Sequence, residues 1–195
     1  VEVPYNYYIC YVTLENKNLS HLPVYLLSED QMSRYAIYMA TLGNRPDLFP
    51  GSEYVGKYTE TPEGYEVPRE YLDDETFAAI LSEAEKYIGY PYVGGGSGPA
   101  TSFDCSGYVS WVINHSGWNV GRLGAQGLYN ICTPTSNPQP GDLVFFKGTY
   151  DTPGVSHCGI YVGDGRMLHC GDPIGYANLN TSYWQSHFYA YGRLP

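Results

Sequence analysis

The apolar residues of this chain change their spacing part-way along the sequence, and that change limits the fold more than any other feature. Over residues 73–89 and 104–117 they recur every three or four positions, as on one face of a helix. From Pro138 onward they form short runs between glycine and proline turns, as strands do. Helices followed by strands predict an α+β domain in which helices pack on an antiparallel sheet.

Two helices and four strands are specific enough to be given bounds. Asp73-Asp74 supplies the cap of the first helix, and Gly89 ends its apolar stripe. Asp104 opens the second helix, which Gly117 ends. The stripe of the first helix comprises Phe77, Ile80, Leu81, Ala84 and Ile88, and the predicted strands are Leu143–Phe146, Val155–Val162, Met167–Cys170 and Phe188–Arg193.

The first part of the chain reads as a separate, small α/β segment. A β-branched and aromatic run predicts a strand within residues 1–15, and helical spacing predicts a helix from Ser28 to Gly43. We therefore divide the chain into residues 1–72, to which no activity is assigned, and residues 73–195, the main domain.

Charge excludes one broad class of function. Ten basic and 20 acidic residues give a net charge of -10, which argues against a nucleic-acid-binding surface. The acidic run over residues 60–85 is predicted to be a solvated, non-catalytic face. No apolar run approaches the roughly 18–20 residues that span a bilayer, so we expect no membrane insertion. Because the chain begins at Val1, we expect that a preceding segment was removed, and location is not readable from its absence.

Five cysteines are an odd number, so at least one thiol is free. Cys105 stands at the predicted start of the second helix, where free N–H groups and the helix dipole stabilise a thiolate. A small buried cysteine is the competing interpretation. His157 and His169 lie in neighbouring predicted strands downstream, and the three together fit a nucleophile, a base and an orienting group.

These residues resemble the NlpC/p60 cysteine peptidases, which cleave bacterial cell-wall peptides. The resemblance rests on Asp104-Cys105-Ser106-Gly107, on His157-Cys158-Gly159-Ile160-Tyr161-Val162-Gly163, on His169, and on the stretch from Pro138 to Phe146. It covers residues 75–195. The first 70 residues are similar to the segment that precedes this domain in wall hydrolases encoded on conjugative elements of Gram-positive bacteria.

The resemblance implies a papain-like fold and hydrolysis of the peptidoglycan stem peptide between D-glutamate and the following diamino acid. It implies Cys105 as nucleophile, His157 as general base and His169 as the residue that orients the base. Tyr92 matches an active-site tyrosine, while Asp104 and Ser106 match residues that bind the amine of the stem peptide. Asp104 as a plain helix cap is the alternative. Relatives commonly carry Trp where this chain has Gly94, which leaves the subsite specificity open. The implied location is extracellular or on the cell surface.

Two alternative functions belong to other classes. The first is a catalytically silent wall-binding or scaffold module of the same fold, against which the intact Cys105, His157 and His169 argue. The second is a zinc site built from His157, Cys158, His169 and Cys170. Adjacent strand residues point to opposite faces, so these side chains do not converge on one ion. We expect no cofactor, and the sequence leaves the oligomeric state open.

The turn between the two histidine strands predicts their register. A three-residue loop, Gly163-Asp164-Gly165, places Gly159 opposite His169 and puts both histidines on one face. The same register places Cys158 opposite Cys170 on the other face. We favour two buried thiols there, with a cross-strand disulfide as the alternative.

Overall fold

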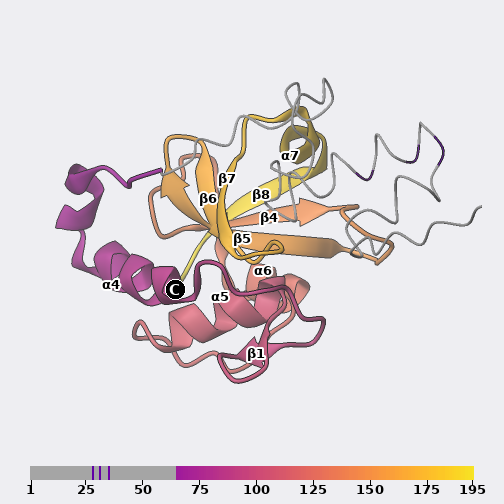
Figure 1. Cartoon of the computed structure of the whole chain (residues 1–195). Helices are drawn as coiled ribbons and strands as arrows, with labels where there is room; N and C mark the ends of the chain where they lie inside the picture. Colours follow the sequence, from indigo (N-terminus) through magenta and orange to yellow (C-terminus); the bar gives the residue numbers. More distant parts are fainter. Residues whose placement is uncertain (1–27, 29–30, 32–34, 36–64) are drawn as a thin grey trace, which may run out of the picture.

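The computed structural model describes residues 65–195 together with Ser28, Gln31 and Tyr35. Most of the helices precede the strands of the main sheet along the chain. This sheet has six antiparallel strands in the order β3-β8-β4-β5-β6-β7 (Figure 1). The elements in chain order are η3 (Arg69–Asp73), α4 (Glu75–Ala84), η4 (Glu85–Tyr87), β1 (Ser97–Gly98), β2 (Ser102–Phe103), α5 (Cys105–Asn114), α6 (Ala125–Ile131), β3 (Thr133–Thr135), β4 (Leu143–Lys147), β5 (Val155–Gly163), β6 (Arg166–His169), β7 (Gly175–Asn178), α7 (Ser182–His187) and β8 (Phe188–Arg193).

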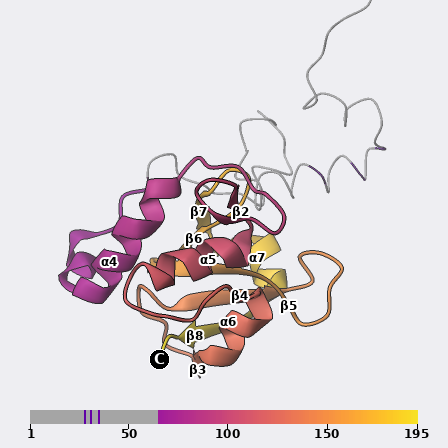
Figure 2. The same ribbon diagram turned by 90° about the horizontal axis from the view of Figure 1, so that it is seen from below.

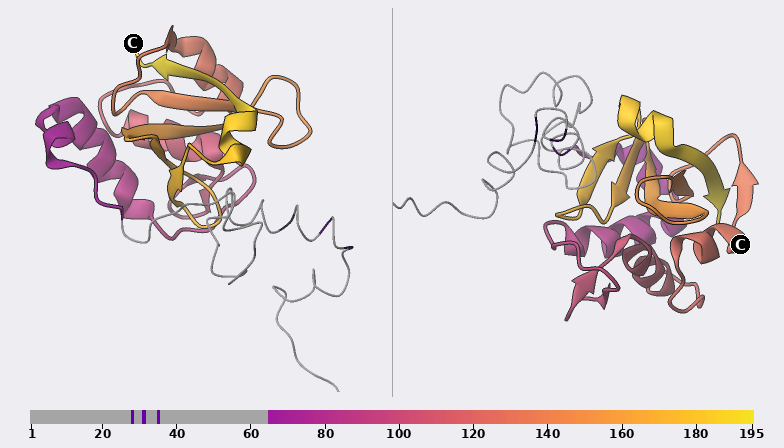
Figure 3. Two further views of the ribbon diagram at one scale, coloured as in Figure 1. Left: turned by 90° about the horizontal axis from the view of Figure 1, so that it is seen from above. Right: turned by 90° about the vertical axis from the view of Figure 1, so that its right-hand side faces the viewer.

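Helices cover both faces of this sheet. Helices α4, α5 and α6 lie on one side, and the short α7 lies on the other (Figures 1 and 3). Seen from the helical side, α5 lies across the central strands (Figure 2). The arrangement confirms the predicted α+β class. It also confirms the four strands predicted after Pro138, although β6 begins and ends one residue earlier than expected.

Both predicted helix starts are built as the sequence indicates. The Asp74 carboxylate accepts hydrogen bonds from the backbone N–H groups of Thr76 and Phe77, at 2.9 and 3.1 Å. Asp104 caps α5 in the same way, accepting from Gly107 N–H at 2.7 Å. One prediction is wrong: Ile88 lies outside the stripe and is 44% exposed, because η4 tightens the chain after Ala84 and turns it away from the core.

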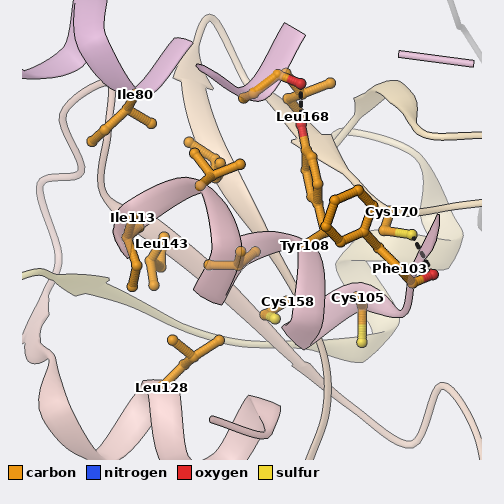
Figure 4. Packing of buried hydrophobic residues seen from close by; sticks show 14 of the residues in the cluster. Ile80, Phe103, Cys105, Tyr108, Ile113, Leu128, Leu143, Cys158, Leu168 and Cys170 are labelled. Atoms are coloured by element: carbon orange, nitrogen blue, oxygen red, sulfur yellow. Dashed lines mark hydrogen bonds between the residues drawn. The ribbon is translucent and has the colours of Figure 1, made fainter. Parts of the chain in front are cut away.

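The main core lies between the helices and the sheet (Figure 4). A buried hydrogen bond of 2.9 Å from the Tyr108 hydroxyl to the carbonyl of Ala84 joins α5 to α4. Each large apolar side chain buried there contributes about 1.5–3 kcal/mol to folding. The core side chains of α4 that seat this helix are Phe77, Ile80, Leu81 and Ala84.

In the described part of the acidic run, residues 65–85, the acidic side chains are exposed except at one position. Glu66, Glu70 and Glu75 are exposed, as predicted, but Glu83 is 9% exposed. Its carboxylate accepts from the Tyr87 hydroxyl at 2.7 Å and lies 2.5 Å from the Lys86 ammonium, so its charge is compensated. The prediction treated the whole run as a surface feature. It did not consider that Tyr87, four residues further along the chain, could accompany Glu83 into the protein and donate a hydrogen bond to its carboxylate.

The turn between β5 and β6 differs from the predicted one. Gly163 pairs with Arg166, so the loop holds only Asp164 and Gly165, both with positive φ. A bulge between Tyr161 and Gly163 then shifts the register by one residue. Ile160 therefore faces Leu168, which is the predicted register reached by another route.

Several elements were not predicted. The sequence analysis missed α6, α7, β3 and β7, which are short, and the two-stranded β1-β2 pair. The predicted strand within residues 1–15 and nearly all of the predicted helix from Ser28 to Gly43 fall outside the described residues. Among the residues that are described, no helix combines the length and apolar character needed to cross a membrane.

Candidate active site

Cys105 is the first residue of α5 and is 4% exposed. The first turn of a helix presents unpaired N–H groups and the positive end of the helix dipole, both of which favour a thiolate. Gly107 lets a neighbouring loop approach this turn, since any Cβ there would overlap the carbonyl oxygen of Gly96. The glycine of the Asp-Cys-Ser-Gly motif is thus required by packing.

Neighbouring groups favour ionisation of this thiol. The pKa of Cys105 lies well below its ordinary value, because the Cys158 thiol and the His157 imidazole both stabilise the thiolate. Burial and the charge of Asp104 act in the opposite direction. Cys105 therefore meets the electrostatic requirement for a nucleophile.

The two predicted histidines are in direct contact. His157 Nε2 lies 2.9 Å from His169 Nδ1, and the ring planes are nearly perpendicular at 83°. This bond uses Nε2 of His157 and leaves Nδ1 as the ring nitrogen for the thiol. The predicted placement of both histidines on one face of the sheet is confirmed.

Burial keeps the second histidine neutral. His169 is fully buried, and that burial lowers its pKa well below the ordinary value, with a further contribution from His157. Trp184 of α7 fixes the pair: its ring stacks on His157 with centroids 5.5 Å apart and meets His169 edge-on at 5.4 Å. The sequence analysis missed Trp184, because a six-residue helix has too short a pattern to be recognised.

Tyr92 lies in the loop before β1 and is 40% exposed. Its backbone N–H donates to Asp172 Oδ1 at 3.1 Å, and the residue forms a bridge with Phe103. Partial burial raises its pKa, and the charges of Cys105 and Asp104 add to the effect. The hydroxyl therefore stays protonated and can donate a hydrogen bond near the thiol.

Asp104 and Ser106 flank Cys105 and share a partner that the sequence analysis did not find. Arg122 donates to both Asp104 oxygens from Nη2, at 2.8 and 2.6 Å, and from Nη1 to Ser106 Oγ at 3.0 Å. Ser106 Oγ in turn donates to Asp104 Oδ1 at 3.0 Å. No local pattern marks Arg122, which lies 18 residues beyond Asp104 in a loop.

The other cysteines of this region face the core. Cys158 and Cys170 are fully buried free thiols, and Cys170 Sγ lies 3.3 Å from the carbonyl oxygen of Phe103 (Figure 4). The favoured interpretation of two buried thiols is confirmed. The histidines meet on the Trp184 side instead, and within the described ranges no three acidic, histidine or cysteine side chains are grouped to hold a metal ion.

Proteins of one known family are similar to this chain over the residues that include the candidate site. The model of the NlpC/P60 family matches residues 89–193. The chain is 42% identical over 121 residues to the bifunctional muramidase/DL-endopeptidase CwlT of Bacillus subtilis (strain 168). This match covers 60% of this chain and 36% of CwlT. A solved NLP/P60 family protein similar to a lipoprotein, from Staphylococcus aureus, superimposes with a TM-score of 0.60 at 40% identity, over 73% of this chain and 47% of that one.

A more distant structure shows the same fold. RipD of Mycobacterium tuberculosis, described as a non-catalytic NlpC/p60 domain protein adapted to peptidoglycan binding, is 20% identical with a TM-score of 0.50, over 60% of this chain and 95% of RipD.

Because the family model matches more than half of the chain, the protein belongs to the NlpC/P60 family. The predicted papain-like fold is thereby confirmed. The chain spans about a third of the length of CwlT.

Proposed function

We propose that this domain is a cysteine endopeptidase that hydrolyses the stem peptide of peptidoglycan between D-glutamate and the following diamino acid. The observation that carries the proposal is the buried contact of 2.9 Å between His157 Nε2 and His169 Nδ1, beside the Cys105 thiol with its lowered pKa. The name of CwlT, a DL-endopeptidase with 42% identity to this chain, supports the choice of bond.

In the proposed reaction the Cys105 thiolate attacks the amide carbonyl, with His157 as the imidazolium partner. His157 donates through Nε2–H to Nδ1 of neutral His169, so the His169 proton resides on its own Nε2. This bond fixes the ring orientation of His157 without adding a formal charge. His169 is accordingly a positioning residue.

The carbonyl oxygen becomes negative during the attack and requires donors that are already in place. The backbone N–H of Cys105 at the start of α5 is one such donor, and the protonated Tyr92 hydroxyl is the second. His157 then protonates the leaving amine, which releases the first product and leaves an acyl-enzyme. A water molecule activated by His157 hydrolyses the thioester and restores the thiol.

Asp104 and Ser106 are proposed to face the substrate next to the reacting bond. A substrate ammonium at Asp104 would share the carboxylate with the Arg122 guanidinium, which lies 2.6 Å from Oδ2. This proposal predicts that Asp104→Asn raises KM for stem peptides with a free amine more than for the same peptides acetylated at that amine. Equal changes in KM for both would restrict Asp104 to its capping role.

A silent wall-binding module is the alternative, and the description of RipD shows that this fold is compatible with it. The contact between the two histidines and the lowered pKa of the Cys105 thiol favour hydrolysis here, since binding of the cell wall requires neither. Peptidoglycan is the proposed partner in both cases. The proposed location is therefore extracellular or at the cell surface of a Gram-positive bacterium.

Mass spectrometry of fragments from defined muropeptides tests the function directly. The wild-type protein should release products cut after D-glutamate, and Cys105→Ala should release none while keeping its melting temperature. Products from Cys105→Ala would exclude this nucleophile. Intact muropeptides that nonetheless bind the wild-type protein would favour the silent module.

A further inference from the structure

Arg122 joins three segments around the candidate nucleophile. Through Asp104 it connects to the glycine loop, because Gly95 N–H donates to Asp104 Oδ2 at 3.1 Å. Through the same carboxylate it connects to the first turn of α5, where Gly107 N–H is capped. Its own loop is held as well, since Nη1 also contacts the carbonyl oxygen of Leu123.

The geometry of the pair leaves Asp104 little freedom. Both carboxylate oxygens accept from Nη2, and Oδ1 accepts additionally from Ser106 and Gly107. The side chain of Asp104 is only 14% exposed, so this ion pair is screened less than a surface pair. Removing the guanidinium would leave a largely buried, uncompensated carboxylate beside Cys105.

Several charged and titratable groups surround the thiol. His157 and Cys158 approach it from β5, Tyr92 from the loop before β1, Tyr150 from the β4–β5 loop, and Cys170 from the residue after β6. Asp104 is the one acidic group that opposes thiolate formation among these, and Arg122 is the cation bound to it.

We propose that Arg122 is a positioning residue of this active site: it fixes the first turn of α5 and neutralises Asp104, which would otherwise oppose the Cys105 thiolate. This inference rests on the proposed function only in treating Cys105 as the nucleophile. Arg122 acts through Asp104 and needs no contact with the reacting atoms.

The chain supplies a matched control for this role. Arg193 forms a comparable ion pair with Asp142, here through two nitrogens, with Nε to Oδ1 at 2.9 Å and Nη2 to Oδ2 at 2.8 Å. Asp142 is 5% exposed, so its pair is at least as buried on the acidic side as that of Asp104. Asp142 is not among the groups with the strongest influence on the pKa of the Cys105 thiol.

The test measures the rate of Cys105 alkylation by iodoacetamide between pH 5 and 9, which requires no peptidase activity. We expect Arg122→Gln to slow alkylation by a factor on the order of 10 at pH values below the thiol pKa, because the Asp104 charge is then no longer compensated and opposes the thiolate. Arg193→Gln should follow the wild-type profile. In an Asp104→Asn background, Arg122→Gln should produce no further shift.

Arg122→Lys keeps the charge but loses the second nitrogen, which in Arg122 contacts Ser106, and should give a profile between the wild type and Arg122→Gln. It serves as the test if Arg122→Gln does not fold. A wild-type profile for the variant that folds would overturn the proposal. So would an equal shift in Arg193→Gln, or a shift that persists in the Asp104→Asn background. Muropeptide cleavage is measured in a separate assay. If no cleavage is found, the alkylation rates still show whether Arg122 affects the Cys105 thiol.

Discussion

At the scale of single residues, two cysteines of this domain have opposite chemistry. The pKa of the Cys105 thiol lies well below its ordinary value, whereas burial raises the pKa of Cys132 to about 12. At pH 6.5 we therefore expect Cys105 to react faster than the other thiols of the described residues. Cys132→Ala should keep the fast phase of iodoacetamide labelling and Cys105→Ala should lose it, as read by peptide mapping. A fast phase that survives in Cys105→Ala would contradict this prediction.

His169 should couple stability to pH. Its folded-state pKa is lowered by burial, while the unfolded chain titrates near about 6.5. Between these two values the unfolded state binds more protons, so the free energy of unfolding decreases as pH falls, by about 1.4 kcal/mol per pH unit. Above the unfolded-state pKa the contribution is complete.

Urea unfolding of the wild type and His169→Asn between pH 4 and 8 measures this coupling. The variant lacks the titrating group, so its free energy of unfolding should depend less steeply on pH than that of the wild type. The difference in slope should correspond to the uptake of one proton on unfolding. Two curves that run parallel over this range would show that His169 does not titrate on unfolding.

At the scale of elements, the β5–β6 turn depends on Gly163. Its φ of +91° is unfavourable for other residues, and a Cβ there would overlap the ring of Tyr71. We expect Gly163→Ala to reduce stability by about 1–3 kcal/mol. Gly94→Ala is the control, because a Cβ at Gly94 meets no atom within 4 Å. Thermal melts that shift equally for the two variants would refute the role given to Gly163.

The elements also show which predictions a sequence can support. The starts of α4 and α5 were predictable because Asp74 and Asp104 cap N–H groups two or three residues away. Arg122 and Trp184 were not, since their partners come from distant parts of the chain. The strand register was right for the wrong reason: a bulge compensated a turn one residue shorter than predicted.

At the scale of the whole molecule, the folded unit extends beyond the family match at its N-terminal side. The match begins at residue 89, yet Tyr65 and Tyr71 pack against the core, and Tyr71 donates to Asp164 at 2.9 Å. The boundary between residues 1–72 and 73–195 remains a prediction, and so does the resemblance of the first segment to wall hydrolases of conjugative elements. Tyr65 and Tyr71 therefore belong to the packed unit although both precede residue 73.

Two truncated proteins test this extent. A fragment of residues 65–195 should melt cooperatively, whereas a fragment of residues 89–195 should not. The shorter one lacks the three large core side chains of α4, Phe77, Ile80 and Leu81, worth about 4.5–9 kcal/mol of burial, which is comparable to the entire stability of a typical domain. A cooperative melt of the shorter fragment would contradict the prediction.

The position of strand β5 bears on how the proposed activity would respond to heating. It lies inside the six-stranded sheet, between β4 and β6, and its consecutive residues His157 and Cys158 serve opposite faces. A slip of one position would bring a thiol to the place of the imidazole, so no partly displaced strand retains a working site. The proposed peptidase activity and the near-ultraviolet circular dichroism should therefore be lost together on heating, so that turnover of the proposed substrate would report on the intact sheet.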